Sequence, residues 1–231
     1  MNSTMRKQLI FLIGFSFLCV ITFALVKIVK SQEPKAQDSS DVEAIRRGGL
    51  REAARIKGHW VGSMRASYFL KYDLESLAAH SGNVIIGSPI DSSAHLSSDG
   101  HLITTWYRIK ILQSIKGKLL AGEIVTTSLP GGKVVFEDGT SAEIKTPDFD
   151  GMQSDQTYVV FLSPALNADG SFSPTGGSQG VFEIDGKTRR IKPNGDSLDA
   201  VQKHKDQDLQ RFLEEIRAAV KKFPEASACC N

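Results

Sequence analysis

LITTWYRIKILQSIKG, residues 102–117, alternates between two kinds of side chain. One parity is mostly apolar or β-branched: Ile103, Thr105, Tyr107, Ile109 and Ile111. The other parity carries Thr104, Trp106, Arg108 and Lys110. This period of two predicts a half-buried β-strand over residues 101–112. A strand of about ten residues is long enough to bend round the side of a small barrel.

Asp-Gly dipeptides punctuate the chain on both sides of this stretch. They stand at residues 99–100, 138–139, 169–170 and 185–186, each between apolar runs. Asp-Gly favours tight turns with positive φ, so each dipeptide predicts a hairpin. The strands expected from this punctuation are 84–90, 101–112, 123–129, 133–137, 140–145, 157–163, 171–173, 181–185 and 187–191. Many short strands without interleaved helices predict a mainly β fold with flanking helices, closed as a small antiparallel Greek-key barrel or a sandwich.

Three further patterns refine this fold. The run YVVFL at 158–162 is apolar on both faces, which predicts a central strand covered on both sides. The hairpin at Asp138-Gly139 would pair Val135 with Ala142 and has no cleanly apolar face, so we expect it to project from the barrel. Residues 198–222 carry an apolar stripe at helical spacing and predict a C-terminal amphipathic helix that covers the sheet.

The N-terminal region contains an uncharged apolar run at residues 9–26. About eighteen residues in a helix span roughly 27 Å, close to the hydrocarbon thickness of a bilayer. A secretory signal has a shorter apolar region and a small-x-small cleavage site, for which this run offers poor candidates. The sequence therefore favours an uncleaved single-pass membrane anchor over a cleaved signal that would release the protein. Either interpretation places the body outside the cytoplasm, in the periplasm or the extracellular space.

The expected organisation follows from these patterns. The chain divides into an anchor or signal segment (1–30), a linker (31–41), a juxtamembrane helical segment (42–80), a β-barrel domain (81–192), a C-terminal helix (193–224) and a tail (225–231). A helix over 41–57 begins with a capping box and is weakened by Gly48-Gly49. A second short helix is expected near 72–80.

Candidate chemistry is sparse. The net charge of +2 gives no nucleic-acid footprint, and no motif predicts a cofactor. His95 and His101 flank the turn at Asp99, which makes a weak candidate for a loop metal site or an envelope-enzyme site. Cys229 and Cys230 are adjacent near the end of the chain, and in an oxidising compartment one of them is a candidate for an intermolecular disulfide.

Four segments stand in an order typical of a known group of proteins: LAAHSGNVIIG (77–87), YRIKILQSIKG (107–117), LPGG (129–132) and YVVFL (158–162). They resemble uncharacterised exported bacterial proteins with a small Greek-key barrel of the oligonucleotide/oligosaccharide-binding type, as in netrin-like modules and tissue inhibitors of metalloproteinases. The resemblance covers residues 74–191 and implies a fold and an exported location. Gly82-Asn83 replaces the usual acidic residue before the first strand, and the glycine before Tyr158 is missing. The inhibitors act through a cysteine framework that this chain lacks, so that mechanism does not carry over.

These observations predict a membrane-anchored extracytoplasmic β-barrel module that is not an enzyme and binds a protein or an envelope ligand. The binding candidates are Trp106, Arg108 and Lys110, which lie on the outward parity of the strand. An outward tryptophan needs cover. We expect Trp106 to be partly buried by the segment before Asn83 or by the C-terminal helix. The alternative function is an envelope enzyme or a protease inhibitor with a site near His95, Asp99 and His101.

Overall fold

The structure, a computed structural model, describes residues 39–64, 71–146, 149–194 and 200–226. The predicted anchor at 9–26, Cys229 and Cys230 lie outside the described residues. Within the described ranges, no helix has the length and apolar character needed to span a bilayer. The chain divides into two units, Met1–Glu43 and Ala44–Asn231, and apart from residues 39–43 the fold described below lies in the second.

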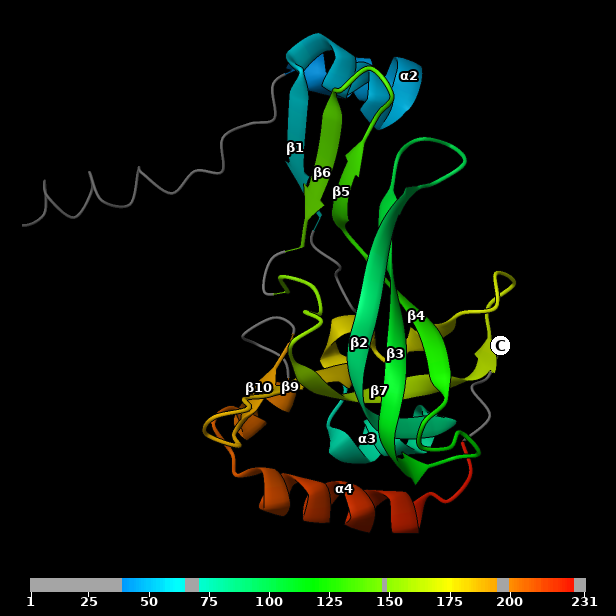
Figure 1. The fold of residues 1–231 in the computed structure, drawn as a ribbon, viewed down its shortest axis with the longest axis vertical. Helices are drawn as coiled ribbons and strands as arrows, with labels where there is room; N and C mark the ends of the chain where they lie inside the picture. Colours follow the sequence, from blue (N-terminus) through cyan, green and yellow to red (C-terminus); the bar gives the residue numbers. More distant parts are fainter. Residues whose placement is uncertain (1–38, 65–70, 147–148, 195–199, 227–231) are drawn as a thin grey trace, which may run out of the picture. The chain divides into compact units, whose positions relative to one another are not determined.

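The main sheet closes into a ring of five strands (Figure 1). The strands are β2 (Asn83–Leu96), β3 (Ile103–Lys116), β4 (Ile124–Pro130), β8 (Phe172–Pro174) and β7 (Thr157–Leu166), and β7 returns to β2. Neighbours in the ring are antiparallel except β4 and β8, which are parallel. The prediction of a mainly β fold is therefore confirmed, and the stretch at 102–117 is one of the two long strands that form its wall.

Two short strands extend the sheet beyond β7. β9 (Val181–Ile184) follows the short helix η2 (Gly177–Gly180) and pairs with β7, and β10 (Ile191–Pro193) pairs with β9. The predicted strand at 187–191 is wrong. The Asp185 carboxylate accepts hydrogen bonds from the amides of Lys187 and Thr188, which holds these residues in a turn and delays the strand to Ile191.

A second sheet contains the strands β1 (His59–Ser63), β6 (Ser141–Lys145) and β5 (Gly132–Val135) in the order β1-β6-β5. The β5–β6 hairpin therefore stands apart from the ring, as its pattern predicted. Its register differs by one residue from the expectation, because Val135 pairs with Ser141 and Val134 with Ala142. Phe136 donates its amide to the Thr140 carbonyl (2.8 Å), so the loop has one residue more than the two-residue turn expected at Asp138-Gly139.

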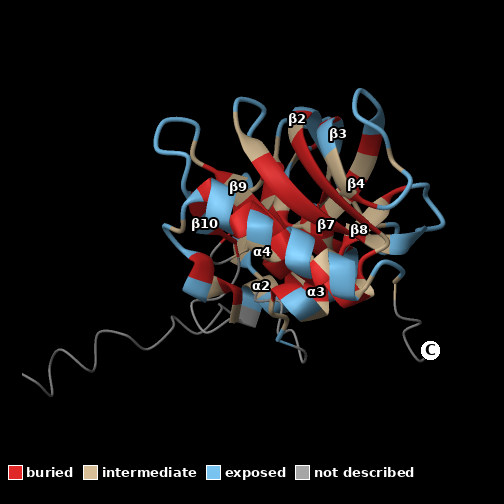
Figure 2. Ribbon diagram, turned by 90° about the horizontal axis from the view of Figure 1, so that it is seen from below, coloured by how far each residue is buried: buried red, intermediate tan, exposed pale blue. Residues whose placement is uncertain are grey.

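Helices cover the outside of β7 (Figure 2). α3 (Leu74–His80) and α4 (Leu209–Lys222) pack with Val159 and Phe161 of β7 in one core, whereas Val160 and Leu162 point into the ring. The prediction that this strand is covered on both faces is confirmed. The continuous helix expected over 198–222 is wrong. A short helix, η3 (Ala200–His204), precedes α4, which begins after Asp208, whose side chain accepts from the Arg211 amide.

A third core joins the two sheets. α2 (Ser39–Lys57) is kinked at Gly48-Gly49, the glycine pair expected to weaken it, and packs Leu50 and Ala54 against Trp60 and Ile103. Gly49 has φ +68°, and a Cβ there would lie 2.5 Å from the Gly100 carbonyl oxygen. The kink therefore allows close contact between α2 and the turn that joins β2 to β3.

Candidate functional site

β3 carries the predicted binding residues on its outer face. Trp106 lies between Ser93 of β2 and Ser128 of β4 in the register of the sheet, and Arg108 and Lys110 follow on the same parity. Arg108 and Lys110 are exposed, and Trp106 is half-buried. Trp106, Arg108 and Lys110 together are called the outer face of β3 below.

His95 covers part of Trp106. The two ring centroids are 4.6 Å apart with the planes inclined by 36°, and His95 Nε2 lies 2.8 Å from Ser93 Oγ. Trp106 is partly buried, as expected. The ring that contacts it belongs to His95 of β2 and not to the segment before Asn83 or to the C-terminal helix. The expected end of the β2 strand, residue 90, was too early: β2 continues to Leu96 and brings His95 beside Trp106 across the sheet.

The cations of this face have different surroundings. Arg108 Nη1 lies 2.7 Å from Asp91 Oδ2 in a cross-strand ion pair whose side chains are both about half exposed. Such a pair contributes about 1 kcal/mol or less to stability, but it orients the guanidinium. Lys110 forms no ion pair with any described residue. It lies next to Ile124, whose exposed fraction is 50%, so an apolar side chain borders the basic end of the face.

His95, Asp99 and His101 do not form a common site. Asp99 accepts hydrogen bonds from Ser97 Oγ and from the His101 amide, which hold the pKa of its carboxyl below the usual range. His101 Nδ1 is 3.9 Å from Asp99 Oδ1, while His95 stacks on Trp106 instead. In the part of the chain that the structure describes, no group of three or more His, Cys, Asp or Glu residues is arranged to hold a metal ion.

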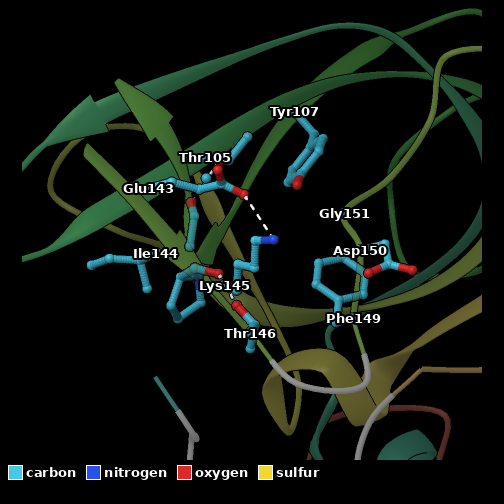
Figure 3. A pocket seen from close by; sticks show the side chains of 12 residues that line it. Thr105, Tyr107, Glu143, Ile144, Lys145, Thr146, Phe149, Asp150 and Gly151 are labelled. Atoms are coloured by element: carbon cyan, nitrogen blue, oxygen red, sulfur yellow. Dashed lines mark hydrogen bonds and ion pairs between the residues drawn. The ribbon is translucent and has the colours of Figure 1, made fainter. Parts of the chain in front are cut away.

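The inner face of β3 contributes to a cavity that the sequence did not reveal. It has a volume of about 270 Å³, and Figure 3 shows the side chains around it. Its walls are Thr105 and Tyr107 of β3, the turn at 130–132, residues 143–146 of β6 and its continuation, and residues 149–151. The only sign of this cavity in the sequence is the pair of hydroxyl residues, Thr105 and Tyr107, among the apolar residues of the inward parity of β3. The other walls come from distant segments, so no local pattern indicates them.

Hydroxyl groups inside this cavity are satisfied by the protein itself. Thr105 Oγ1 donates to the Gly131 carbonyl (2.7 Å) and Thr146 Oγ1 donates to the Pro130 carbonyl (3.0 Å). Burial raises the pKa of Tyr107, whose ring also lines the cavity. The turn requires glycine: Gly132 has φ +121°, and a Cβ there would lie 2.2 Å from Thr105 Oγ1. Gly132 therefore lets the turn pack closely against β3 and form one wall of the cavity.

The rim of the cavity is charged. Figure 3 shows the Lys145 ammonium pointing into the opening, 3.9 Å from Glu143 Oε1, and His59 Nε2 lies 3.9 Å from the other carboxylate oxygen of Glu143. The lining contains no serine or cysteine, and its two threonine hydroxyls already donate to carbonyls. The remaining polar groups of the lining are those of Tyr107, Glu143, Lys145 and Asp150, so the cavity is suited to holding a small polar molecule.

Comparison with known proteins adds no family to these observations. No family model matches the chain, and no curated protein sequence matches it.

Proposed function

We propose that this chain is a membrane-anchored extracytoplasmic binding module that is not an enzyme and recognises a protein or an envelope ligand through the outer face of β3. One observation carries the proposal. Trp106, Arg108 and Lys110 lie together on the outer face of the sheet. The ring of His95 covers part of Trp106, and the tryptophan remains half-buried. Tryptophan and arginine are the residue types most often responsible for binding energy at protein interfaces.

The fold proposed for this module is a five-stranded Greek-key barrel of the oligonucleotide/oligosaccharide-binding type. The ring order β2-β3-β4-β8-β7, with a parallel β4–β8 pair, supports this assignment. Proteins of this type bind their ligands on the face of the second and third strands and with the adjoining loops. Here those strands are β3, which carries the outer face described above, and its neighbour β4.

The chemistry of this face indicates what it recognises. Arg108 is already oriented by Asp91, and Lys110 adds a second cation beside the apolar side chain of Ile124. A ligand with anionic or hydrogen-bonding groups at one end and an apolar surface at the other would complement this arrangement. The nearly balanced total charge disfavours a nucleic acid.

The alternative of an envelope enzyme or protease inhibitor has less support. It requires His95, Asp99 and His101 to converge with another titratable group. In the structure, Asp99 has a side-chain exposure of 70% and His95 stacks on Trp106.

The apolar run at residues 9–26 supports a location in the membrane, as a single-pass anchor. Fractionation of the producing cells followed by alkaline carbonate extraction tests it. We expect the full chain to remain in the membrane pellet, and release into the soluble fraction would refute the anchor.

Site-specific photocrosslinking in intact cells tests the binding surface. A photoreactive residue at Lys110 is expected to give discrete adducts, and one at Lys187, in the exposed β9–β10 turn, is the matched control. Trp106→Ala should abolish the adducts formed from position 110. Identical adducts from both positions, or adducts that persist in Trp106→Ala, would refute the proposed surface.

A further inference from the structure

β1 is an edge strand with unpaired backbone groups. It pairs with β6 on one side, and no described strand pairs with its other side. The Ser141 amide donates to the Gly58 carbonyl (3.1 Å) and the Met64 amide donates to the Lys145 carbonyl (2.9 Å). Because bonded residues alternate in a parallel pair, the even-numbered residues face β6. The N–H and C=O groups of His59, Val61 and Ser63 therefore point away from the sheet, without a hydrogen bond to any described residue.

Apart from its length of five residues, this edge lacks the features that normally prevent strand addition. The β1 sequence HWVGS has no lysine and no proline, and its register with β6 is regular. Other edges are protected: β5 carries Lys133, and the backbone of Ile191 in β10 bonds to Gln207 and Asp206. Val61, at the centre of β1, has an exposed fraction of 47%. A neutral, regular edge with an exposed β-branched residue is open to pairing with another strand.

We propose that β1 pairs with β1 of a second copy of this chain, antiparallel, about a two-fold axis at Val61. In this register Val61 faces Val61 of the second copy, and His59 faces Ser63 on both sides. Each of these residues then gives one hydrogen bond and accepts one, so the outward groups of both edges are satisfied together. The three-stranded sheets of two molecules join into one continuous sheet.

Length and charge favour a second copy over an unrelated strand. Gly58 has φ +74°, so the chain turns away from the strand direction immediately before β1 and limits the edge to a few residues. A second copy has the same limit, and therefore matches the edge along its whole length. The paired side chains include no like-charged pair, since valine faces valine and histidine faces serine.

Sedimentation of the full chain in a non-ionic detergent, over a range of protein concentrations, tests the pairing. The wild type should show a concentration-dependent dimer. Val61→Pro removes an outward N–H that takes no part in the β1–β6 ladder, and should weaken dimerisation roughly thirty-fold by deleting two hydrogen bonds of about 1 kcal/mol each. Val61→Thr keeps the N–H and the β-branched shape, and should dimerise like the wild type. A wild type that stays monomeric throughout, or a Val61→Pro variant that dimerises normally, would overturn the proposal.

Disulfide crosslinking gives an independent measurement if Val61→Pro disturbs folding. Facing residues of a hydrogen-bonded antiparallel pair have Cα atoms about 5.5 Å apart, within the range of a disulfide. In a background with Cys19, Cys229 and Cys230 replaced by serine, Val61→Cys should form a covalent dimer under mild oxidation. Val135→Cys, which is more exposed (66%) but lies on β5, is the control and should stay monomeric. Equal crosslinking from both positions would contradict pairing at β1.

Discussion

Replacing Phe212 by alanine removes a central side chain of the core between the helices and β7. Phe212 is fully buried, and its ring centroid lies 4.9 Å from that of Phe182 and 5.3 Å from that of His204. An aromatic side chain buries about 150–250 Å², worth about 4–6 kcal/mol at 25 cal/mol/Å². Measured replacements of buried phenylalanine by alanine cost about 3–5 kcal/mol. We therefore expect Phe212→Ala to lower the free energy of unfolding by about 4 kcal/mol.

Urea unfolding of the full chain in non-ionic detergent, followed by circular dichroism, measures this loss. With a denaturant dependence of about 2–3 kcal/mol/M, the midpoint should fall by about 1.5–2 M. Phe212→Leu keeps most of the apolar volume and should lose less than half as much. Arg217→Ala, on the exposed face of α4, should change stability by about 0.5 kcal/mol or less. A loss below about 1 kcal/mol in Phe212→Ala would refute the packing of α4 on β7.

Three further predictions concern buried or strained groups. Burial lowers the pKa of His204 below its ordinary 6.5, so below that pH the unfolded chain takes up a proton that the folded chain resists. Urea titrations at stepped pH should therefore show the wild-type free energy of unfolding falling as pH decreases below about 6.5. His204→Gln should lose less of this free energy over the same range, and equal losses in the two proteins would contradict the prediction. Burial raises the pKa of Tyr158 to about 12, so wild-type stability should fall as pH rises above about 10, where the unfolded chain ionises. Tyr158→Phe should lose less over the same alkaline range, and an identical loss would show that the hydroxyl is not responsible. Gly132→Ala forces a Cβ against Thr105 at a positive φ, whereas Gly139→Ala places its Cβ in open space. The free energy of unfolding should therefore fall by about 1–3 kcal/mol more in Gly132→Ala than in Gly139→Ala. Thermal melts compare the two variants, and equal losses would refute the steric argument.

Features with strong local periodicity were predictable from the sequence. The alternation at 102–117 identified β3, and the apolar run at 158–162 identified β7 as a strand covered on both faces. The outward positions of Trp106, Arg108 and Lys110 follow from the same alternation. In each case a short stretch of sequence contains the whole signal, because the period of side-chain burial fixes which face meets the core.

Features that depend on distant pairing were not predictable. β1 has five residues, and its partner β6 lies far along the chain, so nothing within HWVGS identifies it as a strand. The stacking of His95 on Trp106 depends on how far β2 continues after Ile90, where the register shifts by a bulge. The cavity needs walls from separate segments of the chain. Its position depends on β5 and β6 forming a second sheet with β1, apart from the ring.

The hairpin of β2 and β3 belongs to two cores at once. Ile109 lies inside the ring, while Ile103, at the other end of the same strand, is buried beneath α2 with Trp60. Unfolding of the sheet β1-β6-β5 would expose Ile103 to solvent and so destabilise β3, a strand of the ring. The two sheets have no strand in common, but they are joined through the core that contains Ile103. We therefore expect both sheets to unfold in a single cooperative transition, with the β2–β3 hairpin coupling one to the other.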